Sequence, residues 1–93
     1  IKSFGDKVTE KVFQGHSVKK ISPDVLLHAA RKLDMINLVV SLDQLRVPPG
    51  NRLEKLSGKL QGYYSIRIND QYRIIFQWVE GDAYRVKITD SHR

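Results

Sequence analysis

Cysteine is absent from this sequence of 93 residues, which excludes disulfide bonds, a thiolate nucleophile and cysteine-based zinc sites. Long apolar runs are missing as well, since no segment approaches the roughly 20 residues that a membrane-spanning helix requires. The first residues show neither the charged region nor the apolar stretch of a secretory signal peptide. Phosphate-binding loops and the G-x-S-x-G turn of serine hydrolases are also absent. We therefore expect a cytoplasmic protein that has no membrane segment and no hydrolase triad.

Histidine is scarce, and its three copies lie far apart at positions 16, 28 and 92. No two of them have the helical or hairpin spacing at which side chains bind one metal ion together. We therefore expect neither a metal site nor a cofactor.

Acidic residues are outnumbered, with ten Asp and Glu against 16 Lys and Arg, which gives a net charge of +6. More of this surplus lies in residues 46–93 than in residues 1–45. Such a surplus favours a polyanionic partner such as nucleic acid, although charge that serves solubility alone fits equally well. The length predicts one domain over residues 1–93 with a thin hydrophobic core.

The first half of the chain predicts two helices. Residues 1–4 favour a short strand, and Asp6 is a suitable N-cap for a helix over residues 7–14. Ser22 is expected to cap a second helix, because Pro23 fits the first helical position. Apolar residues then recur every three or four positions as far as Val40, which is typical of an amphipathic helix.

The second half predicts strands. Residues 47–50 read Val-Pro-Pro-Gly, which indicates a loop. Alternating apolar and polar residues then predict strands over residues 64–68, 72–79 and 84–88, separated by turn residues. Three strands joined by tight turns form an antiparallel meander.

The alternation gives the predicted sheet two different faces. One face is apolar, and it comprises Tyr64, Ile66, Ile68, Ile74, Phe76, Trp78, Tyr84, Val86 and Ile88. The other face is polar, and it comprises Ser65, Arg67, Asn69, Arg73, Gln77, Arg85 and Lys87, interrupted by Ile75 and Val79. The apolar face requires a cover, and the second helix can supply it. We therefore predict an α+β fold in which two N-terminal helices pack on one face of a small antiparallel sheet.

The polar face is the first functional candidate. Its predicted strands carry cations and no acid, which favours contact with a phosphate backbone over a merely solvated face. Guanidinium groups bind phosphate oxygens in pairs, so Arg67 and Arg73 are the candidate phosphate clamps. In the C-terminal tail, His92 is a candidate general acid or base with Asp90 beside it, or else a surface residue at the end of the chain.

Long stretches of the sequence resemble one protein family. The run RLEKLSG at residues 52–58, the run GYYSIRINDQYRIIFQW at residues 62–78, GDAY at residues 81–84 and the closing Asp90-x-His92 are similar to HigB toxins of the RelE superfamily. The resemblance implies a microbial-ribonuclease-like fold and a ribosome-dependent endoribonuclease that inhibits translation. It also implies a partner antitoxin with a helix-turn-helix domain, of the HigA type, through which alone the toxin would meet operator DNA.

The resemblance further implies a reaction without metal, in which a ribose 2′-hydroxyl attacks the scissile phosphate of mRNA. On matching positions Arg73 would clamp the phosphate, and Asp90 and His92 would orient the reactants or act as the base. The residues expected to bind RNA are Lys55, Lys59, Arg67 and Lys87.

Two positions depart from the family pattern. Ser91 stands where a tyrosine is usual, and Ser57 stands where a lysine or arginine is common. Lys55 and Lys59 lie close to Ser57 in the sequence and are candidates to replace the missing cation. The alternative function is therefore a catalytically impaired module that binds RNA or the antitoxin. A DNA-binding protein is disfavoured, because no predicted helix carries the basic and amide residues that a major groove requires.

Overall fold

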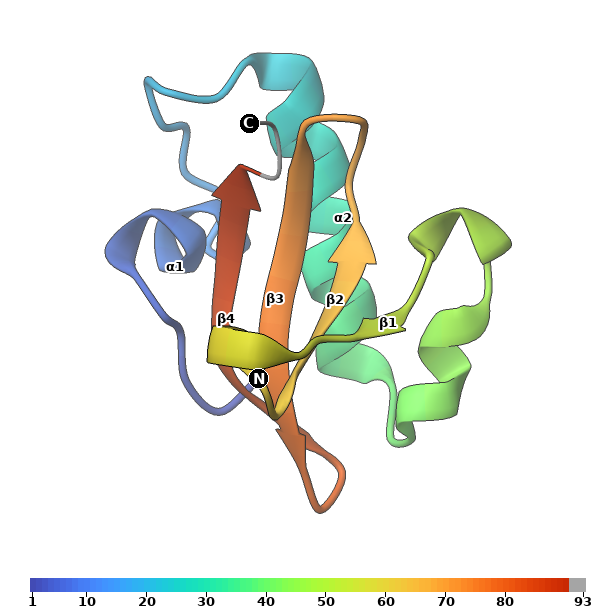
Figure 1. Cartoon of the computed structure of the whole chain (residues 1–93). Coiled ribbons are helices and arrows are strands. Elements are labelled where there is room, and N and C mark those ends of the chain that lie inside the picture. Colours follow the sequence, from blue (N-terminus) through green and yellow to red (C-terminus); the bar gives the residue numbers. More distant parts are fainter. Residues whose placement is uncertain (91–93) are drawn as a thin grey trace.

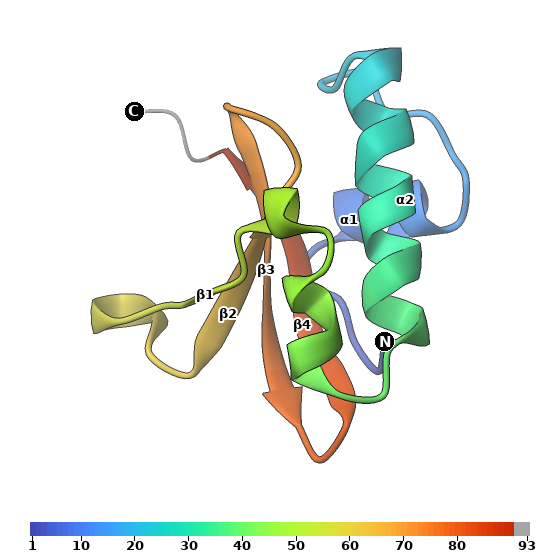
Figure 2. The same cartoon turned by 90° about the vertical axis from the view of Figure 1, so that its right-hand side faces the viewer.

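The computed structural model describes residues 1–90 and has the expected α+β arrangement (Figure 1). Two α-helices and a four-stranded antiparallel sheet of order β1-β2-β3-β4 make up the fold. Their bounds are α1 Lys7–Phe13, α2 Pro23–Leu38, β1 Glu54–Lys55, β2 Tyr63–Arg67, β3 Tyr72–Val79 and β4 Asp82–Asp90. Figure 2 shows both helices on the same side of the sheet, which leaves the other side open. The predicted fold class is confirmed.

The two helices begin where the sequence predicts. The Asp6 side chain accepts a hydrogen bond from the Thr9 amide at 2.9 Å, as expected of an N-cap. Ser22 is the N-cap residue of α2, but its hydroxyl makes no capping hydrogen bond, so this part of the prediction is wrong. The residues around this helix start are exposed, and water can satisfy the free N–H groups of the first turn. α2 ends at Leu38, because Val39 is already extended.

The expected strand over residues 1–4 does not form. The segment makes one parallel bridge, between Phe4 and Val86, and adds backbone hydrogen bonds from Lys2 and Gly5 to β4, each of 2.8 Å. These contacts cover the outer edge of β4, which would otherwise expose unpaired N–H and C=O groups. The chain then bends at Gly5 towards α1, too early for a regular strand.

The predicted loop at residues 47–50 lies within a segment of short 3-10 helices. Their bounds are η1 Leu42–Arg46, η2 Pro49–Asn51 and, after β1, η3 Gly58–Leu60. Asn51 is fully buried, and its amide donates to the carbonyl oxygen of Leu45 at 3.0 Å. Its side-chain oxygen accepts a hydrogen bond from Lys32 of α2, and burial lowers the pKa of that lysine. Through these hydrogen bonds Asn51 connects the segment of 3-10 helices to α2.

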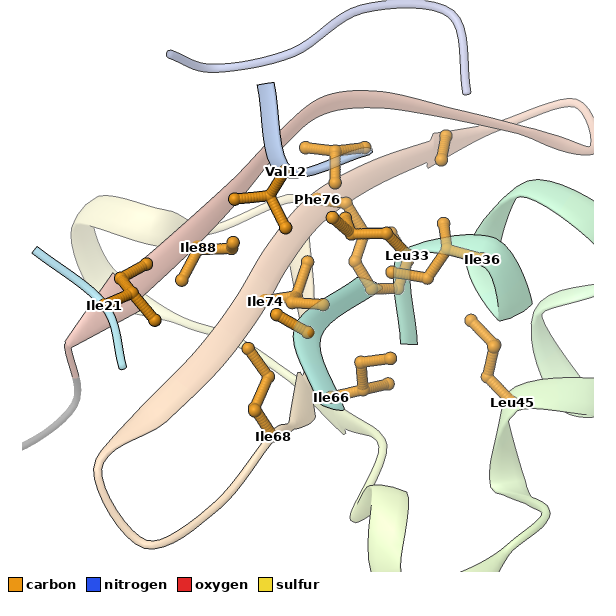
Figure 3. Packing of buried hydrophobic residues seen from close by; sticks show 13 residues of the cluster. Val12, Ile21, Leu33, Ile36, Leu45, Ile66, Ile68, Ile74, Phe76 and Ile88 are labelled. Carbon is orange, nitrogen blue, oxygen red and sulfur yellow. The ribbon is translucent and has the colours of Figure 1, made fainter. Parts of the chain in front are cut away.

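The hydrophobic core lies between α2 and one face of the sheet (Figure 3). Leu33 and Ile36 of α2 are at most 1% exposed, and they pack on the apolar residues of the strands. The buried strand residues are Ile66, Ile68, Ile74, Phe76, Ala83, Val86 and Ile88. α1 joins this layer through Val12, and its buried Thr9 hydroxyl accepts a hydrogen bond from the Ile88 amide at 2.8 Å. The predicted cover of the apolar face by the second helix is confirmed.

A β-bulge in β4 changes the alternation of its side chains. Tyr84 pairs with Gln77, whereas Lys87 pairs with Ile75, so two residues of β4 lie opposite the single residue between them on β3. Arg85 lies in the bulge with a φ of 53°. The expected place of Tyr84 on the apolar face is therefore wrong. Ala83 takes that place, with 1% of its surface exposed, and Tyr84 belongs to the open face.

Candidate active site on the open sheet face

The centre of the candidate site is Arg73, in the second position of β3. Its Nε atom donates to the Ser65 hydroxyl at 3.0 Å, and its Nη2 atom donates to the same oxygen at 2.6 Å. Nη2 also lies 3.3 Å from the carbonyl oxygen of Arg52. Ser65 is completely buried, and the Arg73 side chain is 22% exposed. The guanidinium group is thus held on one edge by the protein, and its Nη1 atom has no hydrogen-bond partner among residues 1–90.

A carboxylate lies beside this arginine. Glu54 Oε1 is 3.3 Å from Arg73 Nη2, and the Glu54 side chain is 54% exposed. The two residues meet because Glu54 pairs with Ser65 across β1 and β2, and Ser65 lies on the open face. Sequence reasoning missed Glu54, since a strand of two residues has no periodicity to detect. The open face is therefore not free of acids, contrary to expectation.

A second acid and an aromatic row extend the open face along the strands. Asp82 pairs with Val79 at the far end of the sheet. Tyr63 and Tyr84 both pair with Gln77, so two half-buried tyrosines flank this glutamine. Aromatic side chains on an open sheet face are suited to stack on nucleic-acid bases. The bulge that placed Tyr84 here could not be detected from the alternation alone.

Arg67 lies next to Arg73, as the predicted face requires. The two arginines are direct cross-strand partners, an arrangement that like charges disfavour. The exposed carboxylate of Asp70 forms an ion pair with Arg67 and offsets this repulsion. Arg67 is therefore near the centre of the site, and its charge is already partly compensated.

The predicted lysines are spread over the molecule. Lys87 is exposed on the open face, where it pairs with Ile75. Lys55 pairs with Tyr64, whose side chain belongs to the apolar face, so Lys55 points to the side of β1 opposite Glu54. Lys59 is exposed in η3. Among these lysines only Lys87 shares the face of Arg73.

The structure does not bring Asp90 and Arg73 together. Asp90 pairs with Tyr72, whereas Arg73 pairs with Thr89, so the two predicted site residues lie on opposite faces of the sheet. The Asp90 carboxylate accepts a hydrogen bond from Gln71 Nε2 at 3.1 Å. It lines a hollow on the helix side together with Asp6, Val8, Lys20, Ile21, Tyr72 and Ile88. Ser91 and His92 lie outside the described residues, and their predicted roles stay predictions.

Within residues 1–90, no group of three or more histidine and acidic side chains is placed to hold a metal ion. None of the helices in the same range is long and apolar enough to cross a membrane.

Known proteins resemble this chain over nearly its full length. Residues 2–92 match the family model described as RelE-like toxin of type II toxin-antitoxin system HigB. Toxin HigB-1 of Vibrio cholerae is 41% identical over 91 residues, which cover 97% of this chain and 95% of that protein. A protein of Haemophilus influenzae without a functional name is 41% identical over 90 residues, or 96% of this chain and 88% of its own length. Endoribonuclease HigB of Proteus vulgaris is 28% identical over 92 residues, which cover 99% of both chains.

The fold and the site together define a small α+β protein with an anchored arginine on an open sheet face. The chain belongs to the family of RelE-like HigB toxins of type II toxin–antitoxin systems. Membership of this family implies an antitoxin as its partner.

Proposed function

We propose that this toxin is a ribosome-dependent endoribonuclease that cuts mRNA by attack of a ribose 2′-hydroxyl on the adjacent phosphate, without a metal ion. The observation that carries the proposal is the Arg73 guanidinium, which Ser65 holds in a fixed orientation with Nη1 left for a ligand. A preorganised cation stabilises the charge that develops on the phosphate oxygens in the transition state. The name Endoribonuclease HigB, carried by the Proteus vulgaris relative, supports the same activity.

The proposed substrate lies across the open face with its scissile phosphate at Arg73. Arg67 and Lys87 are exposed enough on this face to contact neighbouring phosphates. Lys55 and Lys59 are candidates to contact those parts of the RNA that extend beyond the open face near β1 and η3. Asp90, the last residue of β4, and His92, which lies outside the described residues, remain the residues predicted to orient the reactants or act as the base.

The experiment that tests the proposal is the mapping of mRNA 5′ ends after the chain is induced in cells, and in purified ribosomes programmed with mRNA. We expect new 5′ ends with the parent protein and at least a 100-fold slower cleavage with Arg73→Ala, because the variant loses the phosphate clamp. Arg46→Ala is the matched control, since the exposed side chain of Arg46 forms an ion pair with the exposed Asp43 of the same helix η1, away from the sheet face. Equal cleavage by Arg73→Ala and the parent would show that the site is assigned wrongly.

A binding module without cleavage is the second candidate. The departure at Ser57, an exposed residue where the family commonly has a cation, favours it together with Ser91. This candidate predicts growth inhibition or ribosome binding with no new mRNA ends, whereas the ribonuclease produces them.

The antitoxin is proposed to be a helix-turn-helix protein of the HigA type, which would bring the toxin to operator DNA. The proposed place of action is the cytoplasm, because the ribosomes are there. Purification of the toxin with the product of the neighbouring reading frame tests the partner, and an antitoxin without a helix-turn-helix domain would contradict it.

A further inference from the structure

We propose that Glu54 is the general base of the cleavage reaction, the group that takes the proton from the attacking 2′-hydroxyl. The inference rests on the proposed ribonuclease function. It replaces the expectation that a carboxylate at the end of β4 serves this role.

Glu54 lies next to the group that is proposed to hold the scissile phosphate. A general base must lie within hydrogen-bond reach of the proton that it removes. The 2′-hydroxyl and the scissile phosphate are attached to neighbouring carbons of the same ribose. A phosphate bound by Arg73 therefore brings the hydroxyl close to that guanidinium group. Glu54 Oε1 is 3.3 Å from Arg73 Nη2, whereas Asp90 lies on the opposite face of the sheet.

Arg73 is held in place by groups other than Glu54. Both Nε and Nη2 donate to the buried Ser65 hydroxyl, and Nη2 also contacts the Arg52 carbonyl oxygen. An ion pair with a carboxylate that is 54% exposed adds little to the stability of the fold. Orientation of Arg73 and stabilisation of the sheet therefore do not account for Glu54 at this position, which leaves a role in the reaction.

The Glu54 carboxylate is accessible to a substrate. The Oε2 atom of Glu54 has no hydrogen-bond partner among residues 1–90, and the side chain reaches solvent on the face that carries Arg67 and Arg73. Oε1 can keep its ion pair with Arg73 Nη2 while the phosphate binds to Nη1 and Oε2 accepts the proton of the 2′-hydroxyl. No rearrangement of the arginine is needed.

The step balances as a transesterification. Glu54 accepts the proton of the 2′-hydroxyl, and the 2′-oxygen forms a bond to phosphorus. The bond from phosphorus to the 5′-oxygen breaks and leaves its electron pair on that oxygen, which takes a proton from a water molecule. The products are a 2′,3′-cyclic phosphate and a 5′-hydroxyl, and Arg73 balances the charge on the phosphorane.

The test compares single-turnover cleavage of mRNA on programmed ribosomes by the parent, Glu54→Gln and Glu54→Asp. Glutamine keeps an oxygen for Arg73 Nη2 but cannot take a proton, so we expect cleavage to slow by about 100-fold or more. Ribosome and mRNA binding should stay equal or become tighter, because a negative charge near the phosphate is removed. Glu54→Asp should recover part of the rate. Glu10→Gln removes the same charge from α1 and serves as the control.

The pH dependence separates a base from a positioning residue. Within residues 1–90, the charged groups on the face of Glu54 are Arg67, Arg73 and Lys87, with Asp82 at the far end of the sheet and Asp70 paired with Arg67. The cleavage rate of the parent should fall towards acid pH as the base becomes protonated, and Glu54→Gln should lose this limb. Thermal unfolding confirms that each variant is folded.

Three outcomes overturn the inference. Wild-type rates for a folded Glu54→Gln variant would exclude Glu54 as the base. A slower variant that keeps the acid limb would make it a positioning residue. A parent protein that leaves every mRNA intact would refute the proposed function, and the role of Glu54 with it.

Discussion

At the scale of single residues, Ser65 holds the guanidinium group of Arg73 in place. Its hydroxyl is completely buried and accepts two hydrogen bonds from one charged group. Hydrogen bonds to charged groups are stronger than those between neutral groups and fix the donor more closely. A serine in the middle of β2 therefore orients Arg73, its diagonal neighbour on the open face of β3.

Ser65→Ala should reduce the cleavage rate by about tenfold or more, because Arg73 loses the acceptor that orients it. The loss of stability should be about 1–2 kcal/mol, since water can replace the hydroxyl on a partly exposed arginine. Cleavage on programmed ribosomes and urea unfolding measure the two effects. Ser17→Ala, in an exposed loop, is the control. Unchanged cleavage in the folded Ser65→Ala variant would contradict the orienting role.

At the scale of elements, the bulge in β4 determines which side chains reach the open face. It places Tyr84 opposite Gln77 and keeps Lys87 on the same side, at the cost of a left-handed backbone at Arg85. A φ of 53° is strained for residues that have a Cβ atom, and more so for β-branched ones.

Arg85→Val should lower the free energy of unfolding by about 1–3 kcal/mol, whereas Arg85→Gly should change it by less than about 1 kcal/mol. Valine is branched at Cβ and disfavours a positive φ, while glycine tolerates it. Urea unfolding measures both variants, with Thr89→Val in the regular part of β4 as the control. Equal stabilities of the Val and Gly variants would argue against strain at this position.

At the scale of the whole molecule, the helices cover one face of the sheet and leave the other face open (Figure 2). Lys87 is exposed on this open face, and Arg67 and Arg73 are partly exposed there. The basic residues behind the net charge of +6 therefore lie partly on the helical side of the molecule and partly on the open face of the sheet. A polyanion that binds the sheet side releases counterions in proportion to the phosphates contacted there.

Lys87→Ala should therefore weaken the binding of single-stranded RNA and reduce the slope of log affinity against log salt concentration by about 0.7. Fluorescence anisotropy over a series of salt concentrations measures this slope. Arg31→Ala removes one charge from the exposed side of α2 and should leave the slope nearly unchanged. If both variants reduced the slope of log affinity against log salt concentration equally, RNA would not bind preferentially to the open face.

Much of the secondary structure could be predicted because the local pattern was long enough. Apolar or aromatic residues occupy every second position of β3 from Tyr72 to Trp78, and the prediction of residues 72–79 is confirmed at both ends. The start of α2 followed from Pro23, whose φ and missing N–H suit only the first turn. The short strand β1 and the bulge at Arg85 could not be predicted, because neither produces a periodic pattern in the sequence.

The sequence by itself determined the α+β fold and the family, and it predicted Arg73 as the central cation of the candidate site, because these depend on periodicity and on motifs that are contiguous in the chain. Only the tertiary structure decided which groups surround that cation. The pairing of β1 with β2 brings Glu54 to Arg73, and the alternation at the end of β4 turns Asp90 to the other face. Such neighbours depend on strand register between distant segments, where a shift of one residue moves a side chain from one face of the sheet to the other.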